Sequence, residues 1–137
     1  MPFNFKRKIA KFKASQKKLP VAIGALAKSH YLKSFREEGF TDQSLNPWAG
    51  RTTKNRSDRN NKARRGLLVD KGHLRRSIRV VRATWNRVEV GSTGIKYARF
   101  HNRGEGKLPQ RQFVGRSEVL NKKISNRIRR ETKNIFK

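Results

Sequence analysis

Residues 67–115 open as LLVDKGHLRRSIRV (67–80), continue through WNRVEVGSTGIKYARFHNRGEG (85–106) and close as KLPQRQFVG (107–115). Within them the apolar residues change from helical spacing to alternation and back, and glycines with one proline mark the changes of direction. This order predicts a compact α+β core. We expect the segment on each side to form a helix that packs on this centre or extends from it.

Two alternating runs inside this stretch predict a β-hairpin. Residues 79–84 alternate, residues 85–87 permit a reversal, and residues 88–91 alternate again. Before them, Gly72 permits the turn from the buried run 67–69 into LRRSI. After them, residues 92–94 turn the chain into residues 95–101, a strand or a short helix. We expect its aromatic residues Tyr97 and Phe100 to close the core.

The upstream flank predicts a helix from about Pro20 to Glu38. Pro20 suits a first helical turn, where a missing N–H costs nothing, and Gly39 follows as the expected C-cap. The expected apolar face comprises Ile23, Leu26, Ala27, Tyr31 and Phe35. A lone histidine beside this stripe, His30, is expected to be a core or boundary residue rather than a ligand.

Residues 1–18 form a basic N-terminal arm, separate from a single domain over residues 19–137. Phe5, Ile9 and Phe12 recur at helical spacing among seven lysines and arginines, and the first acidic residue of the chain is Glu37. The arm is either an amphipathic helix laid on nucleic acid, a membrane surface or a partner protein, or a frayed and solvated tail. We expect Phe5, Ile9 and Phe12 to bind a partner.

Residues 40–65 lack periodicity and predict a long, basic loop. Its one apolar anchor, Trp48, either attaches the loop to the core or contacts a partner, including by stacking on a nucleobase. Arg64 and Arg65, at the end of the loop, are further candidates for partner contacts. Residues 117–134 predict a C-terminal helix with one narrow apolar stripe and a cationic remainder.

The composition points to an anionic partner. The 137 residues carry a formal net charge of +27 and a pI near 11.8, so the chain repels itself and attracts nucleic acid or an acidic protein face. There is no cysteine, which excludes disulfides and thiolate metal sites. There is no apolar run long enough to span a membrane, and the apolar segment near the N-terminus is too short for a secretory signal.

No pattern in the chain predicts an active site, a metal or a cofactor. The nine acidic residues are scattered, whereas metal-dependent hydrolysis needs carboxylates gathered around the ion. HNRGEGK lacks the Walker spacing and is a turn. His101 with Glu105, and Ser77 with His73 and Asp70, lack the placement that catalytic groups need. We therefore expect a non-enzymatic protein.

One ordered set of residues carries a family resemblance. It comprises Leu67, Leu68, Gly72, Leu74, Ser77, Ile78, Val88, Val90, Gly91, Ser92, Tyr97, Ala98, His101, Gly104, Pro109, Arg111, Phe113 and Gly115, preceded by Phe35, Gly39, Phe40 and Trp48. In this order and spacing, over residues 20–128, the chain resembles the phage virion morphogenesis family, which includes tail completion proteins of contractile-tailed phages and the Mu-type G protein.

The resemblance implies a virion structural protein that completes the tail or joins it to the head, as a subunit of an oligomeric ring. The implied fold is α+β, with a small antiparallel sheet packed by a long N-terminal helix and a C-terminal helix. The residues expected to define that fold are Leu68, Gly72, Leu74, Ile78, Tyr97, Pro109, Arg111 and Phe113.

The implied partners are copies of the chain, proteins on the head connector or portal side, tail tube or sheath proteins, and DNA passing through the ring. No membrane is involved. The expected location is the head–tail junction or tail end of the virion, after assembly in the host cytoplasm. Charge alone supports a second reading, a small nucleic-acid-binding protein of ribosomal or nucleoid type. No RNP, KH or zinc-finger signature accompanies it.

Overall fold

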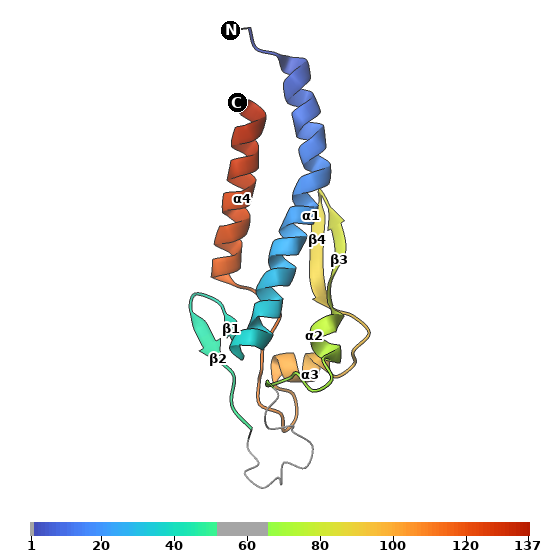
Figure 1. Cartoon of the computed structure of the whole chain (residues 1–137), viewed down its shortest axis with the longest axis vertical. Coiled ribbons are helices and arrows are strands. Elements are labelled where there is room, and N and C mark those ends of the chain that lie inside the picture. The colour runs from blue at the N-terminus through green and yellow to red at the C-terminus, as the bar shows by residue number, and fades with distance from the viewer. Residues whose placement is uncertain (1, 52–65) are drawn as a thin grey trace.

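The structure is a computed structural model that describes residues 2–51 and 66–137. It is elongated, because one long helix runs along most of the molecule (Figure 1). In chain order the elements are α1 (Phe5–Glu37), β1 (Gly39–Thr41), β2 (Leu45–Pro47), α2 (His73–Ser77), β3 (Ile78–Thr84), β4 (Arg87–Ser92), α3 (Ala98–Arg103) and α4 (Glu118–Phe136). These elements confirm the α+β class.

Helix α1 begins at Phe5, where a helix from Pro20 was expected. The Asn4 side chain caps it by accepting a hydrogen bond from the Arg7 N–H at 3.0 Å. Its C-cap is Glu38, which adopts a left-handed conformation with φ 51° and donates its N–H to the Ser34 carbonyl. The helix therefore ends one residue before Gly39, and at about 1.5 Å per residue it is roughly 50 Å long.

Pro20 lies inside this helix and is buried. An internal proline typically costs about 3 kcal/mol, because it removes a backbone hydrogen bond and its ring crowds the preceding turn. Helix α1 packs against α4 and against the β3–β4 hairpin, and this packing supports a helix that continues through Pro20 (Figure 1). The segment expected as an extended arm is thus the first part of α1, and no break in the helix marks residue 18.

The predicted hairpin of residues 79–91 is present as β3 and β4. The strands pair antiparallel from Ile78 opposite Ser92 to Thr84 opposite Arg87, with an irregularity between Val80 and Arg82. The hairpin packs against α1 at Gly24, where an added Cβ would stand 3.0 Å from Cγ1 of Val80. Helix α1 thus contacts this hairpin, and it also contacts α4 (Figure 1).

A second antiparallel hairpin, β1–β2, occupies the start of the expected loop. It makes a separate two-stranded sheet, so the described chain contains two small sheets where one was expected. Gly39 pairs with Pro47, and a Cβ on Gly39 would stand 2.7 Å from the Asn46 carbonyl oxygen. Close approach of the two strands therefore explains this glycine, in place of the helix cap that the sequence suggested.

The hydrophobic core lies at the C-terminal end of α1. Its buried members are Phe35, Trp48, Leu67, Leu74, Ile78, Ala98 and Phe113. The Phe35 ring is central, with its centroid 5.7 Å from that of Trp48 and 5.3 Å from that of Phe113. Leu68, with a positive φ of 59°, packs against this core half-buried.

Gly72 and Ser117 are the N-caps of α2 and α4 and connect these two helices to the rest of the fold. Gly72 has φ 76° at the N-cap of α2, a left-handed conformation that a side chain disfavours. Ser117 caps α4 by accepting from the Leu120 N–H at 3.1 Å, and its own hydroxyl donates to the Thr41 carbonyl at 2.8 Å. Helix α4 is in this way fixed to the β1–β2 hairpin.

The expectation that Tyr97 and Phe100 close the core is wrong. Tyr97 is 46% exposed and Phe100 is 37% exposed, because residues 98–103 form α3, whose buried residue is Ala98. Of the other residues expected to define the fold, Pro109 is half-buried in the segment between α3 and α4. The Arg111 guanidinium donates to the carbonyls of Ala49 and Gly50, at 2.9 and 3.0 Å, and so connects that segment to the end of β2.

Candidate assembly surface

Exposed aromatic and aliphatic side chains gather at the N-terminal end of α1. We call this set, which comprises Phe3, Phe5, Ile9, Phe12 and Trp85, the aromatic end. Phe5 is 66% exposed, Phe12 42% and Trp85 47%. Large apolar side chains this open, on a helix that extends past the hairpin tip (Figure 1), are characteristic of an interaction surface.

The aromatic end is assembled from two elements. Phe12 of α1 meets Trp85 edge to face, with the ring centroids 5.7 Å apart and the ring planes at 76°. The Phe3 and Phe5 rings lie 6.0 Å apart, and the Lys8 ammonium stands 5.9 Å from the Phe3 ring. The arrangement therefore combines apolar area with cations close to the rings.

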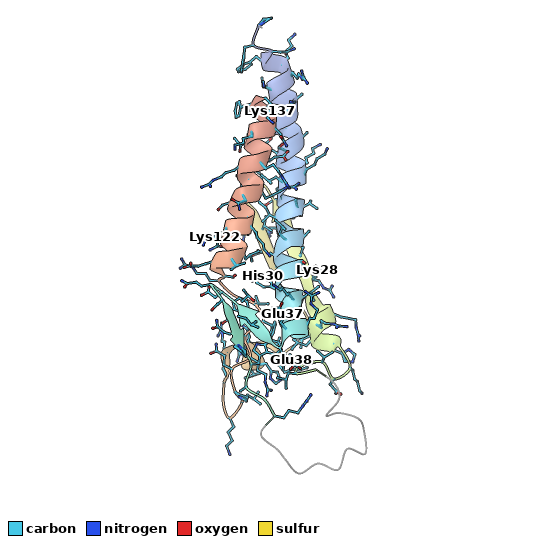
Figure 2. The ribbon with its side chains drawn as sticks, turned by 60° about the vertical axis from the view of Figure 1, so that its left-hand side comes forward. Lys28, His30, Glu37, Glu38, Lys122 and Lys137 are labelled. Carbon is cyan, nitrogen blue, oxygen red and sulfur yellow. The ribbon has the colours of Figure 1, made fainter. Side chains whose placement is uncertain are left out.

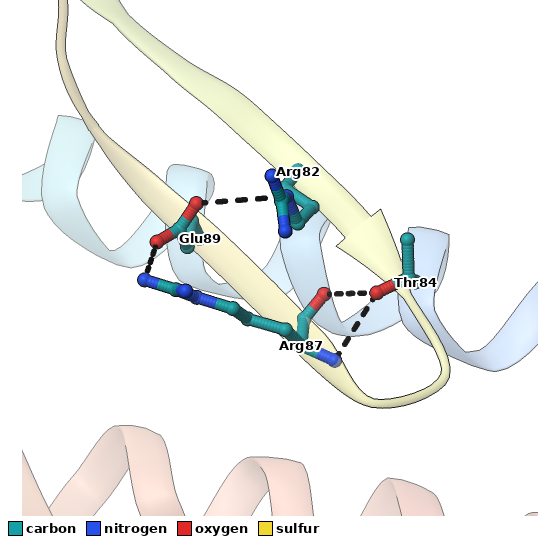
Figure 3. A network of polar contacts seen from close by, with 4 residues as sticks. All are labelled: Arg82, Thr84, Arg87 and Glu89. Carbon is teal, nitrogen blue, oxygen red and sulfur yellow. Dashed lines mark hydrogen bonds and ion pairs between the residues drawn. The ribbon is translucent and has the colours of Figure 1, made fainter.

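A polar network fixes the tip of the hairpin that carries Trp85 (Figure 3). The Thr84 hydroxyl donates to the Arg87 carbonyl at 3.0 Å and accepts from the Arg87 N–H at 3.2 Å. The Glu89 carboxylate pairs with the guanidinium groups of Arg87 and Arg82. Since these contacts close the reversal at residues 85–86, they hold Trp85 next to Phe12.

Helix α4 supports the projecting part of α1. The Lys11 ammonium donates to the Asn134 carbonyl at 3.0 Å, and the Ser15 hydroxyl donates to the Glu131 carboxylate at 2.5 Å.

Desolvation, with repulsion from Lys11 and Arg7, lowers the pKa of Lys8. The cations of this end therefore repel one another, and an anionic partner would relieve that repulsion.

The structure groups some of the residues expected to bind a partner and separates others. Phe5, Ile9 and Phe12 lie together in the aromatic end. Trp48 is only 8% exposed and donates its indole N–H to the Gln112 carbonyl at 2.7 Å, so it is a core residue and offers no contact surface. Arg64 and Arg65 lie outside the described residues.

Sequence reasoning missed two members of the aromatic end, Phe3 and Trp85, and Trp85 is the one that comes from a different element of the fold. Its position in the short reversal between two alternating runs marked it as a turn residue. A large aromatic side chain at a hairpin tip has few neighbours within its own hairpin, so its presence at that position could have indicated a contact with another element.

Ser77 and Glu105 have structural partners. The Ser77 hydroxyl donates to the Leu74 carbonyl at 2.6 Å and lies 2.6 Å from the Ser92 hydroxyl. Glu105 pairs with Arg99 and Arg103 on α3, each at 3.7 Å. Among residues 2–51 and 66–137 no three histidine or acidic side chains are grouped so as to hold a metal ion. Within those same ranges no helix is both long and apolar enough to cross a membrane.

His30, which is buried, and His101, which is half-buried, favour the neutral form of the imidazole. Burial lowers the pKa of His30, and the charges of Lys123 and Lys33 lower it further. The hydrogen bond between its Nε2 and the Thr41 carbonyl, at 3.0 Å, acts in the opposite direction and raises the pKa. Burial also lowers the pKa of His101, to which repulsion by Arg111 adds. Partial or complete burial thus disfavours a positive charge on either imidazole.

Comparison with known proteins indicates which class of protein carries this exposed, cationic and aromatic surface. The chain matches neither a curated protein sequence nor a solved structure at a significant level. The model of the phage virion morphogenesis family, however, matches residues 6–133, which is nearly the whole chain and includes most of α1 and α4. The chain therefore belongs to the phage virion morphogenesis family, and its role lies in the structure or morphogenesis of a phage virion.

Proposed function

We propose that this protein completes the phage tail and joins it to the head, as one subunit of a closed ring at the head–tail junction. It acts as a non-enzymatic structural protein. The observation that carries the proposal is the aromatic end, where Phe5, Ile9 and Phe12 stand uncovered on a helix that family membership places in a virion assembly protein. Covering those side chains with a neighbouring protein would bury apolar area that water now contacts.

The sheet edges support the ring. Each described sheet has only two strands, so β3 and β4 each have one edge without a strand partner among the described residues. Such edges, together with an aromatic end far from the core, give a subunit two different contact surfaces. Contacts between different surfaces form a ring when the rotation between neighbours closes.

The positive charge limits when the ring closes. With a formal charge of +27 per subunit, identical copies repel one another until an anionic partner or salt screens them. Candidate partners are tail tube or sheath proteins, proteins on the head connector side, and DNA passing through the ring. A purely nucleic-acid-binding role would use the charge and could stack the exposed rings on bases, but family membership favours a protein partner for the aromatic end.

Native mass spectrometry tests the ring. The purified chain is measured at several salt concentrations, alone and with isolated tail tubes. We expect a closed oligomer of defined copy number once salt or tubes are present. A strict monomer under every condition, including in material recovered from assembled particles, would overturn the ring.

A further inference from the structure

A groove begins between α1 and α4 and continues along α1 towards α2, away from the aromatic end. One hollow of about 640 Å³ has Ala22, Ala25 and Leu26 of α1 on its floor, with Lys123, Arg127 and Arg130 of α4 along its wall. A second hollow of about 560 Å³ shares Ala25, Leu26 and Lys123 with the first. The shared residues show that the two hollows are parts of one groove. Figure 2 shows the two helices side by side, with Lys28 on α1 and Lys122 on α4.

The spacing of the lining residues gives the groove an apolar part and a cationic part. Positions 22, 25, 26 and 29 lie on one face of α1, and positions 123, 127 and 130 lie on one face of α4. In the first hollow the α1 face is mostly small and apolar, whereas the α4 face is mostly cationic. In the second hollow the cations continue with Lys28, Lys33, Arg36 and Arg75. Neither hollow is lined by a carboxylate from the described residues.

Arg127 is the most informative residue of the groove. Its Nε is buried and has no hydrogen-bond partner among the described residues, although its side chain lines the open hollow. A buried guanidinium N–H without an acceptor is unfavourable, and a carboxylate accepts from such a fork side-on through two parallel hydrogen bonds. The Arg127 guanidinium is therefore a cation that lines the hollow and has an unused donor, and it would attract an anionic group that enters the groove.

We propose that this groove binds an acidic amphipathic helix of another protein. The helix would place an apolar stripe on Ala22, Ala25 and Leu26, and its carboxylates would face Lys123, Arg127 and Arg130. The lining residues of α1 extend from position 22 to position 36, which is about 20 Å and matches a helix of several turns. The proposal goes beyond the tail-joining role, because it concerns a separate surface and binding that is measurable on the isolated chain.

Charge and shape decide the occupant. A second copy of this chain is unsuitable, since it carries 36 lysines and arginines against nine acidic residues. A nucleic-acid duplex presents phosphates on a convex surface and would contact the exposed cations without covering the apolar side chains of α1 that lie between them. A helix with one apolar and one acidic face complements both parts of the groove.

The test measures binding of a defined probe by fluorescence anisotropy. The probe is a labelled Ala/Leu/Glu peptide of about 18 residues, about 27 Å as a helix, with leucines on one face flanked by glutamates. A short DNA duplex is the comparison ligand. The groove variant Lys123→Gln/Arg127→Gln is matched by Lys122→Gln/Arg129→Gln, which removes the same charge from α4 at positions that do not line the groove.

A second pair of variants changes the floor without changing charge. Ala25→Gln fills the groove, and Ala10→Gln makes the same substitution at an exposed position elsewhere on α1. We expect the groove double variant to weaken peptide binding about tenfold more than its matched control. We also expect Ala25→Gln to weaken it while Ala10→Gln does not. Duplex binding should fall equally in both double variants.

Three results would overturn the proposal. Equal losses in the two double variants would assign peptide binding to net charge. Normal peptide affinity in Ala25→Gln would remove the apolar floor from the site, and this single variant decides the matter even if the groove double variant does not fold. A loss of duplex binding confined to the groove double variant, with peptide binding intact, would make the groove a phosphate site.

Discussion

The indole of Trp48 lies edge-on against the ring of Phe35, with the centroids 5.7 Å apart and the planes at 84°. This contact joins the loop after β2 to the C-terminal end of α1, and the Trp48 N–H donates to the Gln112 carbonyl at 2.7 Å. Three segments distant in sequence thus meet at one aromatic pair.

Replacing Trp48 separates the packing from the hydrogen bond. Trp48→Phe keeps a ring beside Phe35 but leaves the Gln112 carbonyl without its donor, so we expect a loss of about 1–3 kcal/mol in the free energy of unfolding. Trp48→Ala should cost about 3–5 kcal/mol, since the ring is lost as well. Urea unfolding measures both. Equal losses in the two variants would show that the ring contact contributes nothing.

Phe113→Ala tests the centre of the core. Phe113 is 2% exposed and lies 5.3 Å from Phe35 between ring centroids, so truncation should cost about 3–5 kcal/mol of unfolding free energy. The exposed Phe100 provides the control, since Phe100→Ala should cost much less. Thermal melting of Phe113→Ala at the wild-type temperature would contradict this position for the core.

Gly72→Val tests the left-handed turn into α2. Gly72 has φ 76°, and a Cβ there would stand 2.8 Å from a terminal nitrogen of Arg76. A β-branched residue in this conformation should cost about 1–3 kcal/mol. Gly91→Val is the matched control, because a Cβ at Gly91 meets nothing within 4 Å and its backbone is in a strand. A lower melting temperature for Gly91→Val than for Gly72→Val would refute this explanation.

His30 predicts a loss of stability on acidification. Because the folded state holds the pKa of His30 below its usual 6.5, the unfolded state binds the proton first as pH falls. Stability is therefore complete above about 6.5 and declines between that value and the lower folded pKa. His30→Gln should reduce the fall in melting temperature from about pH 7 to about pH 5. The same substitution at the exposed His73 should leave the wild-type fall unchanged, and an equal change in both variants would argue against a role for burial.

The alternating runs and the apolar stripe of the last helix were sufficient to predict β3–β4 and α4. Pro20 misled the prediction of α1, because local preference favours a helix start at proline, whereas α1 continues through it as a helix that packs on α4 and on the β3–β4 hairpin. The β1–β2 hairpin was missed because its strands have three residues each, too few to show alternation. In the candidate assembly surface, the helical spacing of Phe5, Ile9 and Phe12 was visible in the sequence. Their contact with Trp85 was not, since it depends on where the hairpin tip reaches along α1.

The most direct test of the account is the yield of joined particles. Isolated heads and tails are combined with wild-type protein, with Phe5→Ser/Phe12→Ser, or with Phe100→Ser, an exposed aromatic control away from the aromatic end, and complete particles are counted by electron microscopy. No charge changes in any variant. We predict that the double variant loses most joined particles while Phe100→Ser keeps the wild-type yield. A normal yield from the double variant, folded as judged by its melting temperature, would contradict the assembly role of the aromatic end.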